Sequence, residues 1–62
     1  MLIFMIRENR KSLYLYLAKD LSSAKRRATK RASSDTTELI IESKDGIVLS
    51  SKVTSGKWKD VH

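Results

Sequence analysis

The residues best suited to chemistry are a dense group of cations in one short segment. They are Lys25, Arg26, Arg27, Lys30 and Arg31, and the segment from Leu21 to Ser34 contains no acid. Arginine can grip a phosphate through two hydrogen bonds, and lysine acts on it as a point charge. Like charges three and four residues apart on a helix repel by about a few tenths of a kcal/mol per pair. An anionic partner would relieve this repulsion, so the pattern predicts binding to nucleic acid or to an acidic protein; a solvated basic helix without a partner is the alternative.

The remaining polar residues form no catalytic or metal-binding pattern. The single histidine is the last residue, His62, and the chain has no cysteine, which excludes disulfides and thiolate metal sites. No base is placed to activate any of the serines, and there is no glycine-rich phosphate loop. The sequence therefore predicts a small non-catalytic binding protein, not an enzyme, with no metal and no cofactor.

The basic segment carries no recognised nucleic-acid-binding signature. It lacks a helix-turn-helix partner, zinc ligands, an RNP-like aromatic motif and a Gly-x-x-Gly loop. The type of nucleic acid therefore stays open. Membrane binding is not expected, because the apolar side of the segment is mostly alanine, with one leucine and no Trp or Phe, whereas several such large side chains anchor interfacial helices.

The 62 residues suffice for one domain, residues 1–62, with a net charge of +6. No run approaches the roughly 18 apolar residues of a membrane span. Charged residues from Arg7 to Lys11 interrupt the apolar start of the chain, unlike a secretory signal. We expect a cytoplasmic protein. Its size, basic content and lack of cysteine are typical of small proteins carried by phages and other mobile elements, which fits an inhibitor or interaction module docking on an acidic partner.

Residues 1–18 are expected to form a β-hairpin. Leu2 to Arg7 is an apolar run, and Ser12 to Ala18 alternates leucine with tyrosine, which indicates a strand. Asn9 tolerates positive φ, so the polar residues 8–11 indicate a turn. A helix from Leu13 to Leu21 is the alternative, but the period of two in the leucines and tyrosines argues against it.

Residues 20–34 are expected to form the helix that carries the cations. The segment is rich in Ala, Lys and Arg, and either Asp20 or Ser22 can cap its N-terminus. At about 100° per residue, one narrow apolar stripe forms. Its members are Leu21, Ala24, Ala28 and Ala32. Small side chains in this stripe let the helix lie close against a sheet, and two serines at positions 33 and 34 end it.

Residues 37–53 are expected to form a second hairpin around Lys44-Asp45-Gly46. Residues 54–62 are expected to form a tail that either adds a short strand or covers an edge of the sheet. A two-residue loop would place the apolar residues of the two strands on opposite faces. A three-residue loop with Gly46 in the left-handed region sets Ser43 opposite Ile47 and places the apolar residues of both strands on one face. These residues are Leu39, Ile41, Ile47, Leu49 and Val53. The three-residue loop also sets Glu38 opposite Lys52, so we favour it.

The predicted fold is α+β, in the order β-β-α-β-β: a four-stranded, mainly antiparallel sheet with one basic helix packed on one face. A two-residue turn at Asn9-Arg10 would pair the first two strands so that one set of leucines lies under the helix. The side chains left on the other face are Ile3, Met5, Tyr14, Tyr16, Ile40 and Val48. A contiguous apolar patch of this kind marks an interface, and we expect a homodimer. Bases stacked on the tyrosines, or a tail folded over the patch with Trp58, are the alternatives.

Overall fold

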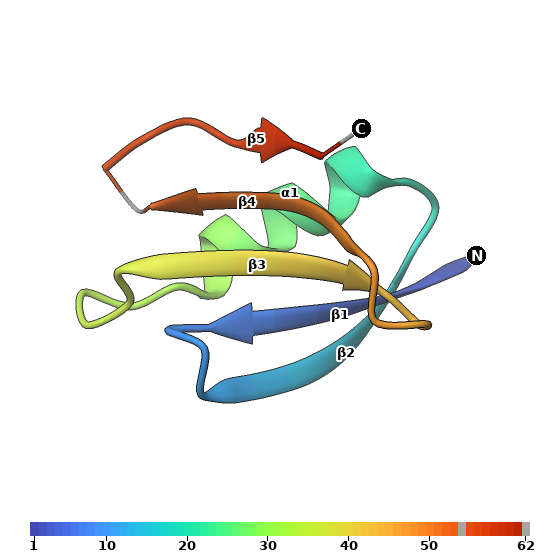
Figure 1. The fold of residues 1–62 in the computed structure, drawn as a ribbon, viewed down its shortest axis with the longest axis horizontal. Helices are drawn as coiled ribbons and strands as arrows, with labels where there is room; N and C mark the ends of the chain where they lie inside the picture. Colours follow the sequence, from blue (N-terminus) through green and yellow to red (C-terminus); the bar gives the residue numbers. More distant parts are fainter. Residues whose placement is uncertain (54, 62) are drawn as a thin grey trace.

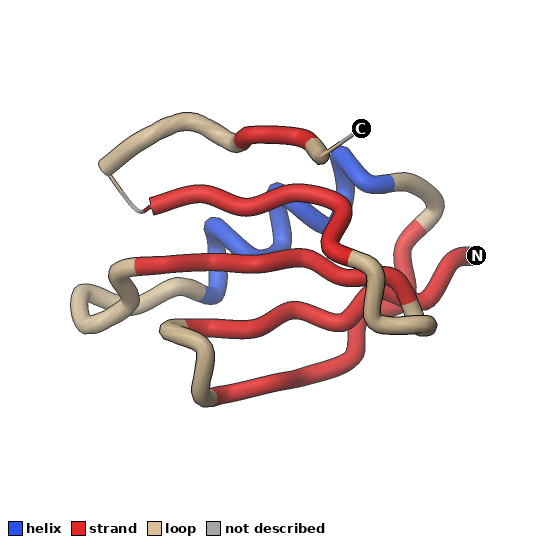
Figure 2. Tube along the Cα trace, in the orientation of Figure 1, coloured by secondary structure: helices blue, strands red, loops and turns tan. Residues whose placement is uncertain are grey.

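The computed structural model describes residues 1–53 and 55–61, which form a five-stranded antiparallel sheet with one helix on one face (Figures 1 and 2). The elements are β1 Leu2–Glu8, β2 Ser12–Ala18, α1 Leu21–Arg31, β3 Glu38–Ser43, β4 Val48–Val53 and β5 Lys59–Asp60. The strands lie in the order β2-β1-β3-β4-β5, so β2 and β5 form the edges. The predicted α+β class and element order are confirmed, and the tail adds the fifth strand.

The first hairpin turns at the predicted residues but leaves one more residue out of the ladder. Asn9 and Arg10 have φ values of 55° and 60°, and the backbone N–H of Lys11 donates to the carbonyl of Glu8 at 3.0 Å. The ladder then begins with Glu8 opposite Ser12, so Lys11 is unpaired. The predicted two-residue loop is therefore wrong by one residue.

This single residue exchanges the two faces of β2, since side chains alternate between faces along a strand. Phe4 lies opposite Tyr16 and Ile6 opposite Tyr14, which places both tyrosines on the helix side of the sheet. The prediction that the tyrosines lie on the far face is wrong, and three leucines take their place there. The face away from the helix, termed the outer face, carries Ile3, Met5, Leu13, Leu15, Leu17, Ile40 and Val48.

The second hairpin has the predicted three-residue loop. Gly46 lies in the left-handed region with φ of 86°, and its N–H donates to the carbonyl of Ser43 at 2.9 Å. The N–H of Ser43 donates to the carbonyl of Ile47 at 2.8 Å, which closes the turn. Ile47 nevertheless stays 63% exposed because it lies at the end of the sheet rather than in the core.

A β-bulge then shifts the register of β4. Glu42 pairs with Val48, whereas Ile41 pairs with Ser50, so Leu49 is an extra residue in this strand. Beyond the bulge the predicted alternation of β4 is inverted. The β4 residue that lies opposite Ile41 beneath the helix is therefore Ser50, which is fully buried, whereas an apolar residue was expected at this position.

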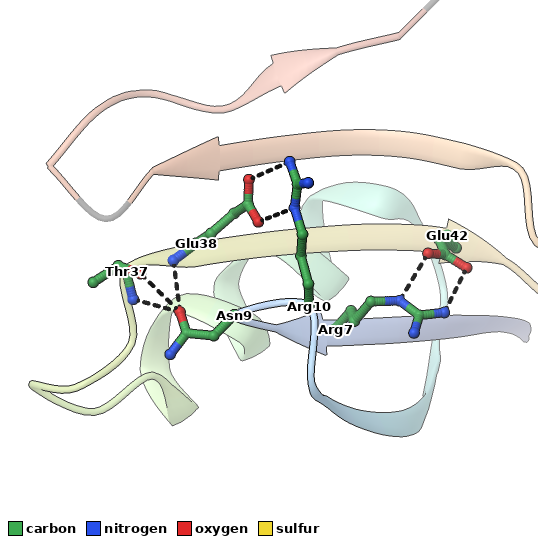
Figure 3. Close-up of polar contacts among 6 residues, drawn as sticks. All are labelled: Arg7, Asn9, Arg10, Thr37, Glu38 and Glu42. Carbon is green, nitrogen blue, oxygen red and sulfur yellow. Dashed lines mark hydrogen bonds and ion pairs between the residues drawn. The ribbon is translucent and has the colours of Figure 1, made fainter.

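The bulge also changes the partner of Glu38. Val53, not Lys52, lies opposite it, and Lys52 pairs instead with Leu39. The predicted Glu38–Lys52 ion pair is therefore wrong, and Glu38 Oε1 lies 2.7 Å from Nε of Arg10 (Figure 3). Leu39 is fully buried as predicted, but Val53 is 56% exposed.

The core lies between the helix and the sheet. Its buried residues are Phe4, Ile6, Ala18, Ala24, Ala28, Leu39 and Ile41. Ala24 and Ala28 have no exposed surface, so the predicted alanine stripe does bring the helix backbone close to the sheet. The helix ends at Arg31, earlier than predicted, because Ala32 adopts an extended conformation.

Asn9 joins the first turn to the segment between α1 and β3 (Figure 3). Its Oδ1 accepts hydrogen bonds from Thr37 N at 2.7 Å, Thr37 Oγ1 at 3.0 Å and Glu38 N at 3.0 Å. Its Nδ2 donates to the carbonyl of Asp35 at 3.0 Å. The chain that leaves the helix is thereby held at a fixed distance from the β1–β2 turn.

No helix among the described residues is long and apolar enough to cross a membrane.

Candidate anion-binding surface

Helix α1 is a well-anchored platform for its cations. Oδ1 of Asp20 accepts a hydrogen bond from Ser23 N at 2.8 Å, which identifies Asp20 as the N-cap. Hydrogen bonds from Ser23, and to a lesser degree the cations Lys19 and Arg26, hold the pKa of Asp20 below its usual value. Two cations occupy the last turn, where they interact favourably with the helix dipole. The charges therefore belong to a fixed element.

Four of the five predicted cations form one exposed cluster, termed the basic surface. They are Arg26, Arg27, Lys30 and Arg31. Within residues 1–53 and 55–61, no carboxylate lies within ion-pair distance of any of them. No ion pair in the described part of the chain therefore neutralises them, and their charge is accessible to an anion.

Two of these arginines stack on the tyrosines of β2. The guanidinium carbon of Arg31 lies 4.0 Å from the ring centroid of Tyr14, and that of Arg27 lies 5.5 Å from the ring of Tyr16. Such cation–π contacts contribute about 0.5–1 kcal/mol each at exposed sites. Burial and the nearby Glu8 raise the pKa of Tyr14, while the two arginines oppose this rise. The stacking restricts the guanidinium groups to defined positions while their charge remains accessible.

The fifth predicted cation, Lys25, has a different environment. Its Nζ lies 2.6 Å from Oδ1 of Asp60, and its side chain is only 21% exposed. The same carboxylate oxygen accepts a hydrogen bond from Ser50 Oγ at 2.8 Å. Lys25 therefore ties β5 to the helix, and it differs from the other four cations in that its charge is paired.

Two open grooves run along the sides of α1. The larger, termed the tryptophan groove, has a volume of about 640 Å³ and is lined by Ser22, Lys25, Arg26, Thr29, Lys30 and Trp58. The smaller, termed the tyrosine groove, has a volume of about 320 Å³ and is lined by Tyr16, Ser23, Arg26, Arg27 and Lys30. Arg26 and Lys30 line both grooves. The helix is thus a cationic ridge with an aromatic side chain in the groove on each side.

Sequence reasoning missed the aromatic contribution to this surface. Trp58 lies on the helix side of the sheet, so the alternative in which it covers the outer face is wrong. Nζ of Lys52 lies 5.6 Å from the centroid of the Trp58 ring. The alternation of tyrosines in β2 was the available signal for Tyr14 and Tyr16, but the length of the first loop decided which face they occupy.

The predicted interface residues divide between the two faces. Ile3, Met5, Ile40 and Val48 lie together on the outer face, whereas the two tyrosines belong to the helix side. The structure thus places two candidate binding surfaces on opposite sides of one sheet.

The helix side gathers exposed cations and aromatic rings, the side-chain types that contact phosphates and stack bases in other proteins. Among the described residues, no three His, Cys, Asp or Glu side chains gather to hold a metal ion. Comparison of the chain with protein-family models, curated proteins and solved structures found no match.

Proposed function

We propose that this protein binds nucleic acid through the basic surface of α1. The observation that carries the proposal is the cluster of four helical cations with no ion-pair partner in the described part of the chain. A structural surface of this size would ordinarily be interspersed with acids, since like charges at helical spacing repel. A bound polyanion offsets that repulsion, because each cation is attracted to its negative charges.

The spacing of the cations suits a phosphodiester backbone. Arg26 and Lys30 form one row and Arg27 and Arg31 a second, and the members of each row are about 6 Å apart along the axis. One strand of a duplex carries a charge for about every 3.4 Å of axis. A backbone that follows the ridge therefore meets several cations at once, and the stacked arginines are already held in place for it.

The aromatic groove walls supply a second type of contact. Trp58 lines the tryptophan groove and Tyr16 the tyrosine groove, on either side of the shared cations Arg26 and Lys30. Aromatic rings beside cations can stack bases as well as hold phosphates. This arrangement supports binding to single strands as well as to duplexes.

The test is the salt dependence of binding, measured by fluorescence anisotropy with a labelled duplex and a labelled single strand. Four phosphate contacts predict a slope of log K against log salt of about −3.6 for a duplex. The double variant Arg26→Gln with Lys30→Gln should reduce this slope by about 1.8. The matched control, Lys44→Gln with Lys57→Gln, removes the same charge away from the helix and should leave the slope nearly unchanged. Absence of binding at low salt, or equal weakening by both variants, would refute the proposal.

A second candidate partner is an acidic protein surface. It is favoured by the pairs of Arg31 with Tyr14 and Arg27 with Tyr16, because arginine and tyrosine are enriched at protein interfaces. Capture of a protein that withstands nuclease digestion and requires Arg27 and Arg31 would favour this candidate. Loss of capture on digestion would favour nucleic acid.

A further inference from the structure

The outer face is a wide apolar surface that no described element covers. Figure 1 views the sheet face-on, with α1 behind it and the outer face toward the viewer. Leu15 and Leu17 are 67% and 57% exposed, and Ile3 and Leu13 are each exposed by more than two fifths. Contiguous apolar patches of this kind mark sites of association.

The charges at the centre of the outer face and at the β1–β2 turn are paired with one another. Arg7 and Glu42, at its centre, are joined by a hydrogen bond of 3.1 Å from Nε to Oε2 and one of 3.4 Å from Nη2 to Oε1 (Figure 3). Arg10 and Glu38 form a second two-bond pair at one end. In a chain with a net charge of +6, the centre of this face is therefore neutral, and the cation Lys59, opposite Ser51 on β5, lies on the same side at the far edge.

We propose that a second copy of this chain packs on the outer face, sheet against sheet, to form a homodimer. A face whose centre is apolar and neutral lets two strongly cationic molecules meet there, with the cation Lys59 at the β5 edge of the contact. The longer extents of the molecule, 29 and 22 Å, limit the face to at most roughly 600 Å² in projection, against about 800 Å² per partner in a standard interface. The area is enough for a specific but reversible dimer.

The position of the cations favours pairing of faces over pairing of edges. Strand β2 is a free edge, and two β2 strands could pair antiparallel across a two-fold axis. Since Arg27 and Arg31 lie over this strand, edge pairing would bring four arginines together on one side of the joined sheet. Centred pairing would also set Lys11 against Lys19 of the second copy, and like charges directly opposite destabilise a strand pair.

Face-to-face packing avoids this repulsion. Packed sheets lie about 10 Å apart, and each helix lies roughly another 10 Å beyond its sheet. The two basic surfaces are then about 30 Å apart on opposite sides of the dimer, several times the Debye length of about 8 Å at physiological salt. The proposal does not depend on the identity of the anionic partner.

The test compares three single substitutions by sedimentation equilibrium on the full chain. Leu15→Asp and Val48→Asp each introduce a charge on the outer face, the first at the β2 edge and the second on β4, far from that edge. Leu2→Asp is the matched control, because Leu2 is 55% exposed but lies on the helix side, opposite Ala18. Circular dichroism confirms that each variant folds, which the exposure of the three side chains favours.

We expect the unmodified chain to dimerise reversibly, with the dissociation constant raised at least about tenfold by Leu15→Asp and by Val48→Asp but not by Leu2→Asp. An effect of Leu15→Asp alone would indicate pairing through the β2 edge and overturn the proposal. A monomer at about half-millimolar concentration would also overturn it. Equal weakening by all three variants would show association that is not specific to the outer face.

Discussion

Asn9 fastens the β1–β2 turn to the segment that follows α1, and we predict that Asn9→Ala lowers the free energy of unfolding by about 3 kcal/mol. Four hydrogen bonds are lost, three accepted by Oδ1 and one donated by Nδ2. Arg31 ends the helix just before the segment that these bonds hold. The substitution therefore also loosens one end of the basic surface.

The magnitude has two parts. A buried hydrogen bond makes a net contribution of about 1 kcal/mol to the free energy of unfolding. Each bond contributes less here, because Asn9 is only half-buried and water can replace part of the lost interaction. Four bonds then give about 2 kcal/mol. Asn9 has φ of 55°, where alanine costs about 1 kcal/mol more than in a right-handed conformation. Together these equal a third or more of the roughly 3–9 kcal/mol expected for a domain of this size.

Urea unfolding followed by the fluorescence of Trp58 measures the effect, because Trp58 packs against the core. Asn9→Gly keeps the left-handed turn but loses the bonds, so it should cost about 2 kcal/mol. Asn9→Asp keeps the three bonds accepted by Oδ1 and should cost less than either. The reasoning is refuted if Asn9→Gly is as stable as the original chain, or if glycine and alanine are equally destabilising.

Three further predictions concern electrostatics. Asp60→Asn weakens the contact that holds Lys25, so binding to an oligonucleotide should strengthen in anisotropy titrations while stability falls by no more than about 1 kcal/mol. Asp20→Ala should lower the urea midpoint at pH 7. The folded-state pKa of Asp20 is depressed, so the stability that Asp20 provides is present above about pH 4 and is lost as the pH falls through the lower folded pKa. The urea midpoints of the original chain and of the Asp20→Ala variant should therefore become equal in acid. Arg31→Gln removes a cation that lowers the pKa of Tyr14, so the ultraviolet titration of Tyr14 should move to higher pH; an unchanged titration would contradict the stacked geometry.

The helix and strands β1 to β4 could be predicted because each depends on local pattern. The alternation in Ser12–Ala18 and the alanine stripe of α1 both reflect a fixed period, and both elements formed as expected. Gly46 has the left-handed conformation that the second turn requires. Hydrophobic periodicity and turn chemistry are therefore sufficient for the order of these five elements, whereas β5 depends on its pairing with β4.

The pairing between strands could not be predicted because it depends on single extra residues. Lys11 and Leu49 each stand outside a ladder, and neither has a side chain that signals a bulge. In β2 leucines and tyrosines are both apolar, so either set was a plausible core face. The actual choice places Tyr14 and Tyr16 where they can meet arginines of the helix, a gain that appears only in the folded molecule.

The same distinction applies to the candidate site. The exposure of Arg26 and Lys30 follows from helical geometry alone, so the sequence was enough to place them. The burial of Lys25 depends on the path of the tail, which brings Asp60 to it from 35 positions along the chain. The contribution of Trp58 to the groove has the same origin. Long-range contacts of this kind leave no local trace in the sequence.

The two proposals together predict that this protein bridges nucleic-acid molecules. A face-to-face dimer directs its two basic surfaces in opposite directions, about 30 Å apart, so each surface engages a separate segment. Energy transfer between donor-labelled and acceptor-labelled duplexes should therefore appear when the chain is added. Leu15→Asp should abolish the transfer while each duplex is still bound, and Arg26→Gln with Lys30→Gln should weaken both. Transfer that persists in the monomeric Leu15→Asp variant would show that charge neutralisation, and not the dimer, draws the duplexes together.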